Sequence, residues 1–162
     1  MHRAGVACHG ASAGPYASHV RYLAETFALG ALRRGRSIEQ FLGPTSSHDR
    51  PGVRYVEVIP AGTRYEVYLH TLEDAGHETF KDVVEFPPLD PDDDEEEFGR
   101  LVATRDSPPA ALAAAEEATG ALREKWVNVG MVQAEYHDYV MAGRPADSAQ
   151  DGRPWPVPRF GA

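Results

Sequence analysis

Three short apolar runs, separated by turn residues, constrain the fold of this chain more than any other feature. The runs span residues 53–59, 65–70 and 80–86. In the middle run, apolar and polar side chains alternate strictly, which is the period of a strand with one buried face. Because the connections are short, neighbouring strands must be antiparallel. The sequence therefore predicts a three-stranded antiparallel meander.

Helical periodicity flanks this predicted sheet on both sides. It runs over 16–34, where Gly35 supplies a stop, and over the alanine-rich stretch 107–122. Ser107 followed by Pro108 is typical of a helix start, with an N-cap side chain and a proline in the first helical position. These helices are expected to cover the apolar face that a small sheet cannot leave exposed.

Three further segments are less simply interpreted. Residues 126–143 continue the helical spacing, with a break at Asn128 and Gly130, and fit one kinked helix or two. Residues 98–105 fit either a short helix or a fourth strand. Residues 37–40 have the spacing of a capping box and predict a short helical turn.

Together these elements predict an α+β domain. An antiparallel meander of three strands, with a fourth strand left open, is covered by an N-terminal helix and one or two C-terminal helices. We expect one domain over 15–142, because a chain of 162 residues has the length of one core. Residues 1–14 are predicted to be a flexible arm. Residues 143–162 are predicted to be a proline-rich disordered tail.

Negative charge is concentrated in one part of the chain. The formal charge is −9, and the acids of 90–97 account for seven of the nine excess negative charges. The rest of the chain is therefore nearly neutral and lacks the basic stripe that a nucleic-acid-binding protein uses against phosphates. We expect no nucleic-acid partner. A cationic protein is the partner that such a local acidic segment favours.

The remaining composition indicates a protein of the reducing cytoplasm. Cys8 is the only cysteine, so no disulfide can form within the chain. The apolar stretch before Ala11 is too short for a secretory signal, and no window approaches the length of a membrane span. We expect cytoplasmic localisation and no membrane partner, and the sequence leaves a homodimer open.

Recognisable catalytic signatures are absent from the sequence. It holds no phosphate-binding glycine loop, zinc-binding motif or nucleophile elbow, so catalysis is doubtful and we expect neither a cofactor nor a metal. The continuous acidic run does not have the alternating ligands of a calcium loop. Glu135, His137 and Asp138 lie together in sequence, but helical spacing does not bring all three to one face.

Two groups of residues are candidates for binding. The first group is partner-binding, and combines the acidic run with the polar side of the middle strand: Asp92, Asp93, Asp94, Glu95, Glu96, Glu97, Glu66, Tyr68 and His70. The second group would line a ligand pocket between the sheet and the aromatic C-terminal helix: Trp126, Asn128, Gln133 and Tyr136. The aromatic members of the second group also have the spacing of core residues.

These candidates give two hypotheses of different kinds. The leading hypothesis is a noncatalytic protein-binding module, such as a small regulator, an adaptor or a toxin-neutralising protein, that uses its acidic loop. The alternative is a small-molecule-binding domain or a small enzyme, with the pocket between the sheet and the C-terminal helix.

Overall fold

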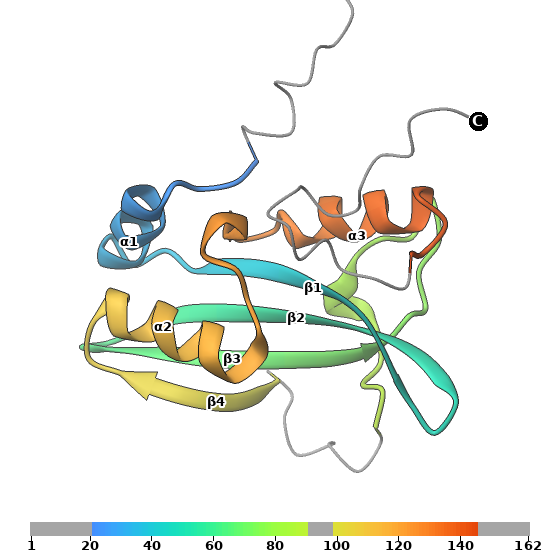
Figure 1. The fold of residues 1–162 in the computed structure, drawn as a ribbon, viewed down its shortest axis with the longest axis horizontal. Helices are drawn as coiled ribbons and strands as arrows, with labels where there is room; N and C mark the ends of the chain where they lie inside the picture. The colour runs from blue at the N-terminus through green and yellow to red at the C-terminus, as the bar shows by residue number, and fades with distance from the viewer. Residues whose placement is uncertain (1–20, 91–98, 146–162) are drawn as a thin grey trace, which may run out of the picture.

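Five antiparallel strands form the centre of the computed structural model, which describes residues 21–90 and 99–145. The spatial order is β4-β3-β2-β1-β5, and Figure 1 shows the four longer strands side by side. The strands have the following bounds: β1 Ile38–Ser47, β2 Arg50–Ala61, β3 Arg64–Glu73, β4 Arg100–Arg105 and β5 Val127–Asn128. The predicted α+β class is confirmed, and the sheet has one strand more than the largest number expected.

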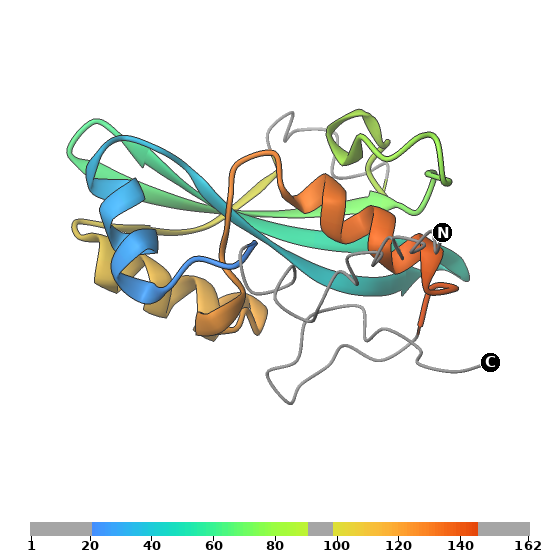
Figure 2. The same cartoon turned by 90° about the horizontal axis from the view of Figure 1, so that it is seen from above.

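The helices are divided between the two faces of the sheet. Helices α1 (Glu25–Arg33) and α2 (Pro108–Thr119) pack against one face, which we call face A. Helix α3 (Val132–Met141) and the short 3-10 helix η2 (Val83–Glu85) pack against the other, face B. Figure 2 shows that α1 and α2 lie towards one end of the strands and α3 towards the other end. Each face is therefore covered over only part of its length.

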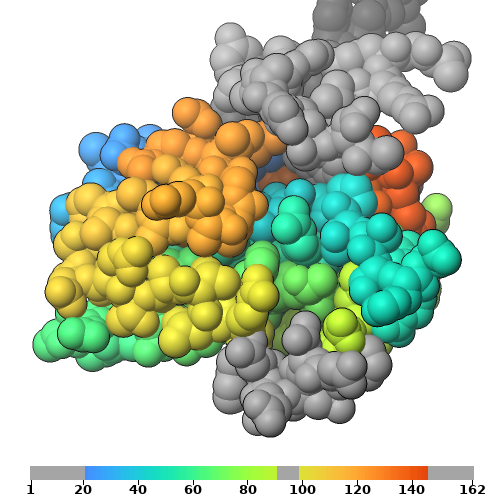
Figure 3. Space-filling model, turned by 60° about the horizontal axis from the view of Figure 1, so that its bottom comes forward, coloured from blue at the N-terminus to red at the C-terminus, as the bar shows by residue number. Residues whose placement is uncertain are grey.

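Two hydrophobic cores follow from this arrangement. The core under face A joins sheet residues to α1, α2 and the segment after α2, through Ile38, Val56, Val58, Val67, Ala28, Leu32, Leu112 and Trp126. The core under face B joins sheet residues to α3 and η2, through Phe41, Val53, Tyr55, Val83, Phe86, Val132, Tyr136 and Tyr139. Figure 3 shows the tip of the β1–β2 hairpin as surface at the end of the sheet away from α1 and α2.

The ends of the helices agree with the local signals in the sequence. Ser107 accepts a hydrogen bond from the amide of Ala110 at the start of α2, with Pro108 in the first turn. Gly120 has a φ of 76° and ends the helix. Gly35, with a φ of 77°, follows α1, and the amide of Arg36 donates to the carbonyl of Ala31. This is the pattern of a glycine-terminated helix.

The predicted helical turn at 37–40 is wrong, because these residues begin β1. Gln40 donates to and accepts from the backbone of Leu122, and Glu39 accepts from the amide of Val132. Ile38 and Phe41 are buried on opposite faces, which only a strand allows at this spacing. The capping-box spacing is therefore overridden by tertiary partners that are far away in the sequence.

The predicted third strand at 80–86 is also wrong. The segment turns through η2, with Asp82 accepting a hydrogen bond from the amide of Val84. Val83 and Phe86 cover the core under face B, so their apolar character reflects burial by a loop. The neighbour of β3 is instead β4, which settles the alternatives for 98–105 in favour of a strand.

The predicted N-terminal helix extends too far towards the start of the chain. Helix α1 begins at Glu25, and its buried side chains are alanines and Leu32, while Phe27 is exposed. At the other end, residues 126–143 are neither one kinked helix nor two helices, because β5 occupies Val127–Asn128 and only Val132–Met141 is helical. None of the helices in the described residues is long and apolar enough to cross a membrane.

Some predictions lie outside the described residues. These include the arm 1–14 and the residues after 145. Of the predicted tail, residues 143–145 are described, and Arg144 Nε donates a hydrogen bond of 2.8 Å to Asp74.

The two hydrogen bonds between Gln40 and Leu122, which join β1 to the segment after α2, can be tested by substitution. The buried amide of Gln40 satisfies both the N–H and the carbonyl of Leu122. Replacing Gln40 with alanine should lower the free energy of unfolding by about 1–3 kcal/mol, because both backbone groups lose their partner. Urea denaturation measures the change. The matched substitution Glu117→Ala, at an exposed position of α2, should change stability by less than about 0.5 kcal/mol. Equal effects of the two substitutions would contradict the assignment.

Candidate functional site

The part of face B that lies beside α3 and η2 carries a row of polar side chains. The register places Glu39 of β1 directly opposite Glu57 of β2, and Glu57 opposite Tyr68 of β3. In the adjacent row on the same face, Tyr55 pairs with His70. Three strands therefore bring two carboxylates, two phenols and an imidazole to one area of the sheet.

The pair Glu39 and Glu57 is electrostatically unfavourable. Like charges that face each other across antiparallel strands destabilise a sheet, since their Cβ atoms are about 5 Å apart. Within the described part of the chain, neither carboxylate forms an ion pair with an arginine or a lysine. Among the described residues, the basic side chain that approaches Glu57 is His70, whose Nε2 is 3.5 Å from a carboxylate oxygen of Glu57. No arginine or lysine within residues 21–90 and 99–145 therefore neutralises this pair of carboxylates.

The His70 ring is held firmly beside this pair. It stacks on Tyr55 with a centroid distance of 4.1 Å and an interplanar angle of 3°. Gly99 also lies against the ring, because a Cβ added there would come within 2.7 Å of His70 Nδ1. Gly99 also has a φ of 84°, which favours glycine. His70 Nε2 is buried and has no hydrogen-bond partner among the described residues.

Glu39 is the most deeply placed of the carboxylates. It is 4% exposed, and it accepts a hydrogen bond of 3.0 Å from the amide of Val132 at the start of α3. Burial raises the pKa of Glu39 to about 7, the amide of Val132 opposes the rise, and the charge of Glu57 adds to it. Near neutral pH a substantial fraction of Glu39 is therefore protonated, and a nearby cation would favour its ionised form.

The same carboxylates act on Tyr55. Its side chain is buried, and its hydroxyl forms no hydrogen bond with the described residues. Burial raises the pKa of Tyr55, and the charges of Glu57, Glu39 and Asp82 raise it further. Tyr55 consequently keeps its proton and presents an O–H group that lacks a partner within the described ranges.

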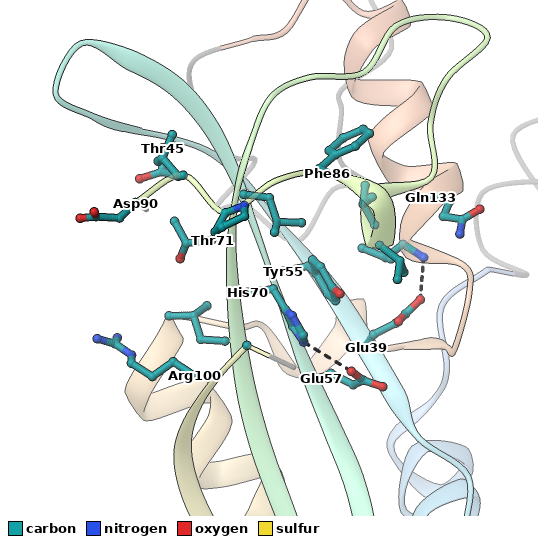
Figure 4. A pocket seen from close by; sticks show the side chains of 18 of the residues that line it. Glu39, Thr45, Tyr55, Glu57, His70, Thr71, Phe86, Asp90, Arg100 and Gln133 are labelled. Atoms are coloured by element: carbon teal, nitrogen blue, oxygen red, sulfur yellow. Dashed lines mark hydrogen bonds and ion pairs between the residues drawn. The ribbon is translucent and has the colours of Figure 1, made fainter. Parts of the chain in front are cut away.

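These side chains line a groove with a volume of about 870 Å³. Figure 4 shows Glu39, Glu57, Tyr55 and His70 gathered on one side of the strands. Arg100 is the only lysine or arginine among the described lining residues, and it lies across β3, pointing away from the two carboxylates (Figure 4). The floor of the groove is acidic and aromatic.

Apolar residues form the rim of the groove. Val84 of η2 is 71% exposed and Val129, which precedes α3, is 58% exposed, and both line the groove. Gln133 of α3 also lines it and donates a hydrogen bond of 2.9 Å to Asp82. The opening therefore combines exposed aliphatic surface with an acidic interior.

The candidate residues on the predicted strand 65–70 all lie on face B. His70 lines the groove, whereas Glu66 and Tyr68 do not. The hydroxyl of Tyr68 donates to Glu66 at 2.6 Å. The acidic candidates Asp92 to Glu97 lie outside the described residues, although Asp90 and Gly99, which flank them in sequence, both line the groove.

The four residues of the predicted ligand pocket do not come together. Trp126 is fully buried in the core under face A, and Tyr136 is buried under face B with its hydroxyl bonded to Asp74. Asn128 is exposed on β5. Only Gln133 lines the groove. The aromatic residues thus serve the cores, which is the role that their spacing also favours.

Sequence reasoning misses most of the residues that define the groove. The spacing of 37–40 places Glu39 in a capping box, and Tyr55 belongs to the apolar pattern of a strand. Glu57 stands out only as a polar interruption of the run 53–59, which could lie near His70 in one register. An acidic residue inside an apolar strand is a usable signal, but its partner depends on the register.

A second polar cluster joins α3 to the N-terminal segment. Arg21 lies 2.7 Å from Asp138 and 3.4 Å from the buried Glu135. His137 is 3.8 Å from Asp138 and is partly exposed. Glu135 and Asp138 therefore share a side, as helical spacing predicts, and bind an arginine. Within the described ranges, no set of three histidine, cysteine or acidic residues could hold a metal ion.

Comparisons with known proteins give no guide to this site. No family model, no curated protein and no solved structure matches the chain. The function must therefore be inferred from the geometry and charge of the groove.

The buried carboxylate of Glu39 makes a testable contribution to stability. Because its pKa is raised from 4.5 to about 7 in the folded protein, the folded state holds its proton more tightly than the unfolded state. Stability is thus lost as pH rises from about 4.5 to about 7. Glu39→Gln removes this loss and should raise the free energy of unfolding at pH 8 by up to about 3 kcal/mol.

The measurement is denaturant unfolding of both proteins at pH 5 and pH 8. The increase in the free energy of unfolding should be large at pH 8. It should be small at pH 5, because at pH 5 Glu39 of the original protein is already protonated. A variant that is less stable at both pH values would show that the ionised carboxylate is compensated within the fold.

Proposed function

We infer that the protein is a noncatalytic binding module that takes a cationic group of a partner protein into the groove on face B. The observation that carries this inference is the direct opposition of Glu39 and Glu57 on neighbouring strands. A positive charge placed between them would convert a destabilising pair into a binding site. Uncompensated charges of this kind occur where a protein sacrifices stability for function.

The shape of the groove supports a basic side chain as the group that enters. Lysine and arginine carry a charged end on a long aliphatic stem. The charged end would lie at Glu39 and Glu57, and the stem would pass Val84 and Val129 at the rim. A deep anchor residue surrounded by apolar contacts is a common arrangement in protein interfaces.

Overall charge is consistent with this partner. The chain has 25 acidic and 16 basic residues. Asp90 and Gly99, which flank the acidic segment in the sequence, line the groove. A basic partner would be attracted towards this region, and the attraction would weaken with salt. The cytoplasmic setting expected from the composition belongs to the same proposal.

A small cationic molecule is the second candidate for the occupant. The volume of the groove, about 870 Å³, lies within the range of about 300–1,000 Å³ that ligand sites occupy. The exposed valines favour the protein partner, because a small ligand does not need apolar surface at the rim.

Selection from a displayed library of short random peptides tests the leading proposal although the partner itself is not identified. Peptides retained by the protein should be enriched in basic residues next to apolar residues. Glu57→Gln should weaken the binding of the retained peptides by about tenfold or more, since the site loses one of its two carboxylates. Fluorescence anisotropy on purified peptides measures the affinities.

Glu117→Gln is the matched control, because it neutralises an exposed glutamate of α2, which packs on face A. It should leave peptide binding unchanged. A library that yields no basic peptides, or peptides that bind Glu57→Gln as tightly as the original protein, would overturn the proposal. Binding of a polyamine or a guanidine compound without any selected peptide would support the small-molecule candidate instead.

A further inference from the structure

The groove holds more unpaired hydrogen-bonding groups than its two carboxylates. The Tyr55 side chain lines the groove, the residue is 5% exposed, and its hydroxyl has no partner among the described residues. His70 Nε2 is buried without a hydrogen bond to any described group, and it lies 3.5 Å from a carboxylate oxygen of Glu57. Leaving a buried polar atom such as Nε2 unpaired is costly, and the Tyr55 hydroxyl beside it is open to a further hydrogen bond, so both point to a ligand that enters the groove.

We propose that the groove is specific for a guanidinium group, so that the partner inserts an arginine in preference to a lysine. This step rests on the proposed function, because it identifies which cationic group the site accepts. Three features favour guanidinium: the acceptors come from different strands, they lie deep in the groove, and they are fixed in position.

The acceptors come from different strands and different rows of the sheet. Glu39 belongs to β1 and Glu57 to β2, and the hydroxyl of Tyr55, which can also accept, belongs to the next row of the same face. An ammonium group directs three donors from a single nitrogen, whereas a guanidinium group spreads five donors in a plane over three nitrogens. Separated acceptors around one groove are therefore better satisfied by guanidinium.

The depth at which Glu39 lies in the groove also favours guanidinium over ammonium. Glu39 is 4% exposed, so a cation that reaches it must lose much of its hydration. Guanidinium is more weakly hydrated than ammonium and keeps its charge when it is desolvated. The cost of entering the groove is therefore smaller for arginine.

The acceptors are also fixed in position before a ligand arrives. Tyr55 is stacked on the His70 ring, which also lies against Gly99, and Glu39 is held by the amide of Val132. A planar group that matches such fixed acceptors loses little entropy for each hydrogen bond formed, and arginine has this property. A flexible acidic patch would not distinguish the two cations in this way.

Titration followed by NMR with small probes tests the specificity directly. The probes are N-acetyl-arginine N-methylamide, its lysine counterpart and its citrulline counterpart, which keeps the shape of arginine without the charge. The arginine probe should shift the amide signals of Val132 and Gln133, with an apparent affinity about tenfold higher than that of the lysine probe. The citrulline probe should give no saturable shift.

Two variants distinguish specific recognition from general attraction. Tyr55→Phe removes only the hydroxyl and should reduce the affinity for the arginine probe more than that for the lysine probe. Glu117→Gln, on α2, should change neither. The unchanged positions of the remaining amide signals in Tyr55→Phe would show that the sheet is intact.

The outcomes separate this inference from the proposed function. Equal affinity for the arginine and lysine probes, or an arginine affinity unaffected by Tyr55→Phe, would overturn guanidinium specificity while leaving a general cation site in place. The absence of binding by both charged probes, together with a peptide library that yields no basic sequences, would overturn both.

Discussion

The register between β1 and β2 is the constraint on which the proposed site depends. It places Glu39 opposite Glu57, and a shift of one residue in either strand would break this opposition and move that strand's carboxylate to face A. The register is fixed from both sides of the sheet. Val58 pairs with Ile38 in the core under face A, and Tyr55 pairs with Phe41 in the core under face B. Hydrophobic burial thus maintains an arrangement that electrostatics alone would oppose.

The uneven cover of face B turns this register into a groove. Helix α3 and η2 cover the end of the face where Phe41 and Val53 lie, and the carboxylates lie beside that cover. The start of α3 serves two purposes, because the amide of Val132 binds Glu39 and Gln133 borders the opening. A fully covered face would have excluded any ligand, and an open one would have left Glu39 hydrated and its pKa near the usual value.

Local signals in the sequence are sufficient for much of the fold. The α+β class, the antiparallel neighbours β2 and β3, and the start of α2 all follow from period-two alternation or from capping residues. The segments 37–40 and 80–86 depart from their local patterns for one physical reason. In both segments a short local pattern predicts one structure, but partners that are distant in the sequence stabilise another. Gln40 binds the backbone of Leu122, and Val83 packs into the core under face B.

The sequence by itself determined which side chains share a strand face, because alternation along one strand does not depend on its neighbours. It thereby placed His70 on the polar side of β3 and identified Glu57 as a polar interruption. Only the tertiary structure decided which residues meet across strands, since register and layer order arise from the packing of both cores at once. For that reason Glu39, Tyr55 and Gly99 joined the candidate site only in three dimensions, while Trp126 and Tyr136 left it for the interior.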